Sequence, residues 1–280
     1  MSINNNRLFR LFKYAVYTLL AINIYIFWAE EVLAAAVQFP DGMHLSQLIG
    51  SFPATIDTAA WVILLLVFEL ETYELEEHHF TPTVTMTLQG IRIVCYAFII
   101  YALYGYIVKL AFVHQTTQFL GLSDLCTLVS NGWSYATGLD EYSQLTAANC
   151  ATISDAGSFV QFESTLAVVD HSGLIDIRHL AWVDVINAAV WLLIVFVLEA
   201  DVWLQERKRY VGAALRTSNM LKVVLYSALL LAAIFWGFKG DFVDFWDALL
   251  WLVAFVFIEL NVFEWRQEGA ASEAQGSNNT

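Results

Sequence analysis

Six long stretches of mostly apolar residues constrain this chain more than any other feature. The stretches cover residues 12–35, 56–76, 92–113, 182–204, 221–239 and 245–265. Because the hydrocarbon core of a bilayer is about 30 Å thick and takes roughly 20 residues of helix to cross, each stretch predicts a transmembrane helix. Only 14% of the residues are charged, whereas soluble domains carry about a quarter. The sequence therefore predicts an all-α, multi-pass integral membrane protein that is surrounded by the lipid bilayer.

The basic residues are distributed unevenly between the two ends of these helices. If the N-terminus is cytoplasmic, all of the 13 lysines and arginines except Lys109, Arg178 and Lys239 fall on the cytoplasmic side. Loops rich in Lys and Arg stay in the cytoplasm, so we expect both termini there. The segment 114–180 then lies outside, and its lack of an Asn-x-Ser/Thr acceptor favours a bacterial inner membrane over a eukaryotic secretory one.

The second, fourth and sixth stretches share the pattern [DN]-x3-W-x7-E-x-[EDN]. Its columns are Asp57, Asn187 and Asp247, then Trp61, Trp191 and Trp251, then Glu69, Glu199 and Glu259, and finally Glu71, Asp201 and Asn261. The other three stretches each have a basic residue, Arg10, Arg92 or Lys222, four residues before a tyrosine. Self-similarity of this kind indicates repeated structural units. We interpret the chain as three two-helix repeats that are parallel, because every copy starts at the cytoplasmic face.

The domain organisation follows from this repeat. Repeat 1 covers residues 1–80, repeat 2 residues 81–113 and 181–210, repeat 3 residues 211–265, and a tail at 266–280 has the composition of a disordered segment. An extracytoplasmic module, 114–180, interrupts repeat 2 and contains Cys126 and Cys150. Because an external compartment permits disulfides, we expect these two cysteines to be linked, the alternative being two free thiols.

The acids of the repeat lie at depths where a charge is costly, about 2.5–3.5 kcal/mol at mid-bilayer, so such residues usually face the bundle interior or water. One interpretation is a cation or proton pathway, in which the two later acidic columns form a constriction near the cytoplasmic end and the [DN] column lies near the outer mouth. The alternative is a clamp, in which the acids near the cytoplasmic end pair with the basic residues Arg10, Arg92 and Lys222 of the first, third and fifth stretches. The two interpretations differ in which way the acids face.

One local cluster departs from the repeat. Glu71, Glu74 and His78 are spaced so that they lie on successive turns of a helix and could hold a divalent metal, whereas the alternative is a solvated acidic helix end. No hydrolase, zinc-protease or nucleotide-binding motif occurs, so the sequence predicts no cofactor and gives no positive sign of an enzyme. The net charge of −14, without a basic patch, argues against nucleic acid as a partner.

The plan of three two-helix repeats is similar to that of the mitochondrial carriers. Those proteins carry a Pro-x-[Asp/Glu]-x-x-[Lys/Arg] motif in each odd helix, whereas Pro40, Pro53 and Pro82 all lie outside the spanning cores, so we exclude that family. The leading functional prediction is a cation or proton channel or transporter. The alternative is a non-catalytic membrane scaffold or subunit that packs against partner membrane proteins or further copies of itself. A membrane-embedded enzyme is a third class.

Overall fold

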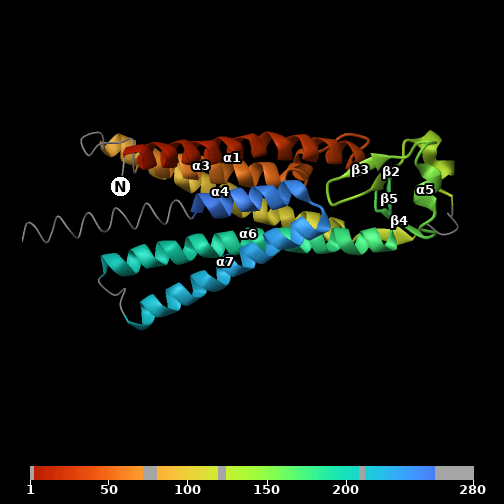
Figure 1. Cartoon of the computed structure of the whole chain (residues 1–280). Helices are drawn as coiled ribbons and strands as arrows, with labels where there is room; N and C mark the ends of the chain where they lie inside the picture. Colours follow the sequence, from red (N-terminus) through yellow and green to blue (C-terminus); the bar gives the residue numbers. More distant parts are fainter. Residues whose placement is uncertain (1–2, 72–80, 119–123, 208–211, 256–280) are drawn as a thin grey trace, which may run out of the picture.

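The computed structural model describes residues 3–71, 81–118, 124–207 and 212–255, and it is mainly helical (Figure 1). Four helices, α1 (Ile3–Gln38), α4 (Pro82–Phe112), α6 (His171–Glu206) and α7 (Ala213–Lys239), are long and apolar enough to cross a membrane. Two shorter helical stretches, α3 (Pro53–Glu69) and residues 242–255, lie among them. This architecture is compatible with a multi-pass membrane protein.

Local sequence explains where several of these helices begin and end. Pro53 and Pro82 occupy the first turn of α3 and α4, where a missing N–H costs nothing. The side chain of Thr81 caps α4 by accepting a hydrogen bond from the backbone N–H of Val84 at 3.3 Å. Helix α7 ends at Gly240, whose φ of 84° lies in the left-handed region that favours glycine.

A small module, residues 114–170, lies at one end of the bundle and contains a sheet that the sequence analysis did not predict (Figure 1). Its strands are β1 (Thr116–Gln118), β2 (Ser134–Ala136), β3 (Tyr142–Gln144), β4 (Phe159–Phe162) and β5 (Ala167–Asp170). They are ordered β1-β4-β5-β2-β3, antiparallel except for the pair β2–β5. The all-α prediction is therefore incomplete, because strands of three or four residues are too short for an alternating pattern to be recognised.

The predicted disulfide is confirmed. Cys126, in the 3-10 helix η4 (Leu125–Asn131), is bonded to Cys150, the first residue of α5 (Cys150–Ser154), with their Cα atoms 4.9 Å apart. Closing a loop of this length stabilises a fold by about 3–4 kcal/mol in the chain-entropy model. The bond thus stabilises a module whose strands are short.

The module ends earlier than predicted. The prediction extended it to residue 180, whereas α6 already begins at His171. Asp170 caps this helix by accepting hydrogen bonds from the backbone N–H groups of Ser172 (3.1 Å) and Gly173 (3.3 Å). The hydroxyl of Tyr135 in β2 also donates to Asp170, at 2.5 Å. Burial alone would raise the pKa of Asp170, but a hydrogen bond from the Ser172 hydroxyl, together with the three just named, lowers it.

Replacing Asp170 with alanine is expected to lower the free energy of unfolding by about 1–2 kcal/mol at neutral pH. Because the pKa of Asp170 is lower in the folded state than the unfolded value of about 3.9, its contribution is present above about pH 4 and is lost as the pH falls through the folded pKa. The difference from wild type should therefore shrink on acidification. Thermal unfolding of detergent-purified protein, followed by circular dichroism, measures this. Asp170→Asn, which keeps an acceptor, should lose less, and a pH-independent difference would contradict the assignment.

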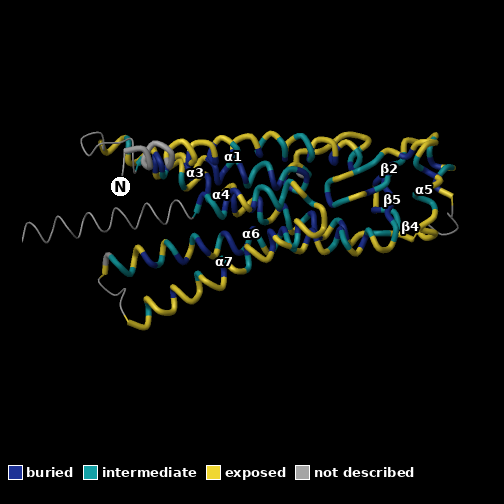
Figure 2. Tube along the Cα trace, in the orientation of Figure 1, coloured by how far each residue is buried: buried dark blue, intermediate teal, exposed yellow. Residues whose placement is uncertain are grey.

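Buried residues line the facing sides of the helices, and exposed residues lie on their outer surfaces (Figure 2). Many of the exposed residues are large and apolar, for example Phe196 at 71% and Val223 at 66% exposure. An outer surface of this composition suits contact with lipid rather than water. The inward sides meet in an apolar core that includes Leu20, Ile194 and Ala254, all fully buried.

Candidate functional site: an acid-lined cavity

A cavity of ≈ 110 Å³ lies at the module end of the bundle. Its walls come from α1, α3, α4, α6, α7 and residues 242–255, and the turn 137–141 between β2 and β3 also contributes. For comparison, an engineered cavity that binds benzene is about 150 Å³ and pockets for drug-sized ligands are about 300–1,000 Å³. The cavity therefore has room for a few water molecules or one small ligand.

The three residues predicted at the outer mouth, Asp57, Asn187 and Asp247, all line this cavity. They come from α3, α6 and residues 242–255, so the structure brings together residues that are far apart in sequence. Asp247 accepts a hydrogen bond of 2.8 Å from the side-chain amide of Asn23 in α1. Asn23 is only 1% exposed. Asp184, one turn before Asn187, lines the cavity too.

Three oxygen atoms in these walls have unused hydrogen-bonding capacity. The Oδ1 atoms of Asp57, Asp184 and Asn187 are buried and accept no hydrogen bond of normal geometry from any residue that the structure describes. Asp184 as a whole is 9% exposed. Leaving a buried oxygen without a partner costs about 1–3 kcal/mol, and more for a charged group, so such atoms are normally satisfied by water or a ligand. These atoms are the first that we expect a ligand to contact.

Carboxyl groups strongly outnumber ammonium groups along the walls. The acidic residues that line the cavity are Glu30, Glu31, Asp57, Asp140, Glu141, Asp184, Asp241, Asp244 and Asp247. The basic ones are Lys109 and Lys239. Because like charges repel one another strongly away from bulk water, this excess is stable only when protons or bound cations neutralise it. A wall of this composition favours a cation or a proton over an anion as its occupant.

Lys109 places its ammonium group among these carboxyl groups. Its Nζ donates a hydrogen bond of 2.7 Å to Oδ2 of Asp140 and lies 3.8 Å from Oε1 of Glu31, and Lys109 is 4% exposed. Asp140 belongs to the turn of the module, whereas Lys109 belongs to α4. This ion pair therefore joins the module to the helix bundle through the cavity.

Glu31 has a second role, because it caps α3 from a neighbouring helix. Its carboxylate accepts hydrogen bonds from the backbone N–H groups of Ala54 (2.9 Å) and Thr55 (3.1 Å) and from the Thr55 hydroxyl (2.6 Å). The first N–H groups of a helix have no partner within it. Glu31 thus fixes the start of α3 and, through it, the position of Asp57.

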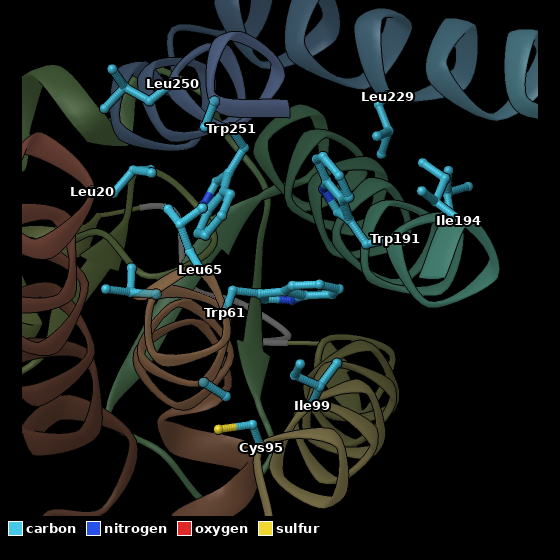
Figure 3. Packing of buried hydrophobic residues seen from close by; sticks show 14 of the residues in the cluster. Leu20, Trp61, Leu65, Cys95, Ile99, Trp191, Ile194, Leu229, Leu250 and Trp251 are labelled. Atoms are coloured by element: carbon cyan, nitrogen blue, oxygen red, sulfur yellow. The ribbon is translucent and has the colours of Figure 1, made fainter. Parts of the chain in front are cut away.

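Three tryptophans, Trp61, Trp191 and Trp251, line the cavity, and their side chains gather where their helices meet (Figure 3). Trp61, Trp191 and Trp251 each lie four residues, or about 6 Å along a helix, beyond the [DN] column. The ring centroids of Trp61 and Trp191 are 5.9 Å apart, those of Trp61 and Trp251 6.3 Å, and those of Trp191 and Trp251 6.4 Å. The apolar core follows below them, so the polar region ends at this aromatic layer.

The rim of the cavity is covered by the module. Leu139, at the turn between β2 and β3, is 6% exposed and belongs to an apolar cluster that also includes residues of α6 and α7. Nearby, the amide of Gln38 donates a hydrogen bond of 3.1 Å to the hydroxyl of Tyr142. Burial raises the pKa of Tyr142 to about 12. Burial also raises the pKa of Asp241, and the negative charge of Asp140 raises it further.

Two of the acids predicted to form an inner constriction belong to α3 and its end, and both are paired. Glu69 forms a buried ion pair with Lys13 and accepts a hydrogen bond of 3.3 Å from the hydroxyl of Tyr17. Glu71 forms an ion pair with Arg92. Arg10 was predicted as a clamp residue, but it is exposed, and Lys13 lies beside Glu69 instead.

The corresponding residues of α6 differ from each other in their surroundings. Asp201 is buried, pairs with Lys222 at 2.9 Å and accepts a hydrogen bond of 2.7 Å from Ser218. Glu199 is exposed and lies 3.4 Å from the hydroxyl of Tyr96. The third copies, Glu259 and Asn261, lie outside the described residues.

Most of the predicted metal site lies outside the described residues. Glu71 contacts Arg92, and Glu74 and His78 lie outside the described residues. Within the described ranges, no group of three or more His, Cys, Asp or Glu side chains is arranged to hold a metal ion.

Glu31, Asp140 and Asp184 were not among the residues predicted from the sequence to form the site. A signal for Glu31 exists, because the pair Glu30–Glu31 interrupts an apolar stretch at a depth where acids are costly. Asp140 carries no such signal, since it is one acid among several in a polar segment. Only the fold of the module brings it to Lys109.

Comparisons of the chain with protein-family models, with curated proteins and with solved structures find no significant match. The class of this protein is therefore defined by its own fold and site. It is a bundle of long apolar helices with an acid-lined cavity beneath a disulfide-bonded module.

Proposed function

We propose that this protein is a cation or proton channel or transporter and that the acid-lined cavity is where the cation or proton binds. The observation that carries the proposal is the set of buried oxygens of Asp57, Asp184 and Asn187. They accept no hydrogen bond of normal geometry from the described residues, and they line a strongly acidic cavity. Acids that face a cavity within a helix bundle are typical of cation and proton pathways. A cation would satisfy both the unpaired oxygens and the excess negative charge.

The architecture we propose is three parallel two-helix repeats with six membrane-spanning helices and both termini in the cytoplasm. Support comes from the meeting of three tryptophans that the repeat alignment places in one column. Further support comes from the ion pairs Arg92–Glu71 and Lys222–Asp201, because each joins residues 21 positions apart at matching points of the pattern. In this orientation the module is extracytoplasmic and the cavity faces that side.

Within this proposal the inner acids act mainly as a clamp, and the [DN] column acts as the binding site. Glu69, Glu71 and Asp201 each contact a basic residue, so they have little freedom to bind a passing cation. Removing one partner of a buried ion pair typically costs about 3–5 kcal/mol, which suits a structural role. Glu199, which is exposed, stays a candidate for the inner part of the pathway.

The same proposal requires a movement. The tryptophan layer and the apolar core below it lie between the cavity and the inner ion pairs, so the described residues offer a cation in the cavity no polar route onward. We therefore propose that the described arrangement is closed toward the cytoplasm. Passage would require α3, α6 and residues 242–255 to move apart at Trp61, Trp191 and Trp251.

Flux into lipid vesicles tests the function. Vesicles that contain the wild-type protein should take up protons or potassium ions faster than empty vesicles. Combining Asp57→Asn with Asp247→Asn should slow this uptake by at least about tenfold, because the cavity loses two carboxylates. The matched control is Asp176→Asn, which removes an acid of α6 that pairs with Lys239 and is not part of the cavity wall.

The outcomes separate the candidate functions. Normal uptake by the double variant would rule out the cavity as the binding site. A wild-type protein that carries no flux, and that purifies in mild detergent with a stoichiometric partner, would instead favour the membrane scaffold.

A further inference from the structure

We infer that the cation bound by the acid-lined cavity is a small organic ammonium ion, that is, a primary or methylated amine. The inference rests on the proposed function, since it names the chemical class of the cation that the same cavity binds. Its basis is that aromatic side chains line the cavity beside the acids. These residues are Phe27, Trp61, Tyr106, Trp191, Trp236 and Trp251.

The aromatic rings and the carboxyl groups offer two complementary contacts. A carboxylate attracts the positive charge and accepts hydrogen bonds from N–H groups, whereas the π face of an aromatic ring attracts the methyl or methylene groups that share the charge of an organic ammonium ion. Tryptophan is the most effective ring for this contact, and aromatic cages are a common way of binding methylated amines. The unpaired oxygens of Asp57, Asp184 and Asn187 supply the polar contacts.

An inorganic cation would make poorer use of these walls. Calcium takes about 6–8 oxygen ligands, and magnesium keeps several of its water molecules. Here the tryptophan layer takes up one side of the cavity, and the carboxyl groups spread over several helices instead of converging within the described residues. A ring offers no lone pair to a metal ion, so the aromatic part of the wall contributes nothing to metal coordination.

The cavity already accommodates an ammonium group that belongs to the chain itself. Lys109 places a primary amine against Asp140 and Glu31, at 2.7 and 3.8 Å, in surroundings that are almost fully buried. The same wall chemistry therefore satisfies an –NH₃⁺ group away from bulk water. A free amine would find equivalent partners at Asp57, Asp184 and Asn187.

The size of the cavity limits the ligand. At ≈ 110 Å³ it is smaller than a cavity that holds one benzene molecule, about 150 Å³. Methylammonium fits this volume. Tetramethylammonium, which is about as large as benzene, is the upper limit, and tetraethylammonium is too large without rearrangement. The expected selectivity therefore depends on both chemistry and size.

Isothermal titration of the purified full-length protein with a series of chloride salts tests the inference. The probes are methylammonium, tetramethylammonium, tetraethylammonium, potassium and magnesium. We expect one of the two smaller ammonium ions to bind at least about tenfold more tightly than potassium or magnesium, because each aromatic contact adds roughly 2- to 30-fold. Tetraethylammonium should bind more weakly than either.

Substitutions at the tryptophan layer provide the second measurement. Trp251→Leu should weaken binding of tetramethylammonium by about tenfold while changing potassium binding little, and Trp251→Phe, which keeps a ring, should weaken it less. Trp182→Leu is the matched control, because Trp182 lies in α6 and is 50% exposed on the outer surface. If Trp251→Leu fails to fold, the ligand series on the wild-type protein decides the question alone.

Each result has a distinct meaning. Potassium or magnesium binding as tight as ammonium, with vesicle flux that depends on Asp57 and Asp247, would overturn the ammonium inference and leave the proposed function intact. No binding of any cation, together with no flux, would overturn both. Ammonium binding that is insensitive to Trp251 would also overturn the assignment, because the aromatic layer would then play no part.

Discussion

Replacing Lys109 with methionine is expected to lower the free energy of unfolding by about 3–5 kcal/mol, the cost of leaving buried carboxylates without their cation. The substitution removes the partner of Asp140 and the nearest ammonium group to Glu31. Both acids line a cavity that is already strongly acidic. Thermal or denaturant unfolding of the detergent-purified protein, followed by circular dichroism, measures the loss.

Lys239 is the matched control for this prediction. It is a lysine of α7 that also lines the cavity, but it pairs with Asp176 where both side chains are partly exposed. Their side chains are 31% and 51% exposed, so water screens the pair and Lys239→Met should cost about 0–1 kcal/mol. Adding Asp140→Asn and Glu31→Gln to Lys109→Met should recover part of the stability, since it removes the uncompensated charges. Equal losses for Lys109→Met and Lys239→Met would contradict the ion-pair argument.

Truncating Trp191 to alanine is expected to cost about 3–5 kcal/mol, the range for the loss of a large buried aromatic side chain. Trp191 is 6% exposed and contacts both Trp61 and Trp251 as well as Phe255, whose ring centroid is 4.6 Å away. Because lipid is as apolar as the side chain, the loss comes from missing van der Waals contacts and an empty volume at the centre of the bundle. Thermal unfolding measures it.

Trp182 again serves as the control, because it belongs to the same helix and is 50% exposed. Trp182→Ala should change the free energy of unfolding by about 1 kcal/mol or less, as expected for a residue on the outer surface. A Trp191→Ala variant as stable as Trp182→Ala would show that the aromatic layer does not hold α3, α6 and residues 242–255 together.

The parts of the molecule that the sequence predicts well are those in which one residue type recurs at fixed spacing. The tryptophan column is an example, since Trp61, Trp191 and Trp251 are aligned in the sequence and in contact in the structure. The [DN] column likewise points to the cavity, because a polar group at that depth must face away from lipid. Burial cost makes both patterns visible without coordinates.

The sequence predicts less well where the outcome depends on a choice between similar neighbours. Arg10 and Lys13 both precede a tyrosine by four residues, and only the packing of α1 against α3 decides that Lys13 reaches Glu69. The sheet was missed because its strands are short, and Asp140 because its contact with Lys109 spans 31 residues. These features depend on three-dimensional contacts that leave no periodic signal.

The turn of the module that places Asp140 beside Lys109 limits how this protein can be redesigned or reduced. The module is joined to the bundle through the chain at α4 and α6. It is also joined by an ion pair, because Asp140 of the module neutralises Lys109 of the bundle. Deleting the insertion to obtain a minimal bundle would therefore leave a buried amine short of a partner as well as an open cavity rim. Transplanting the module onto another bundle would require that bundle to supply a cation at the position of Lys109. The two parts are thus expected to be exchangeable only together.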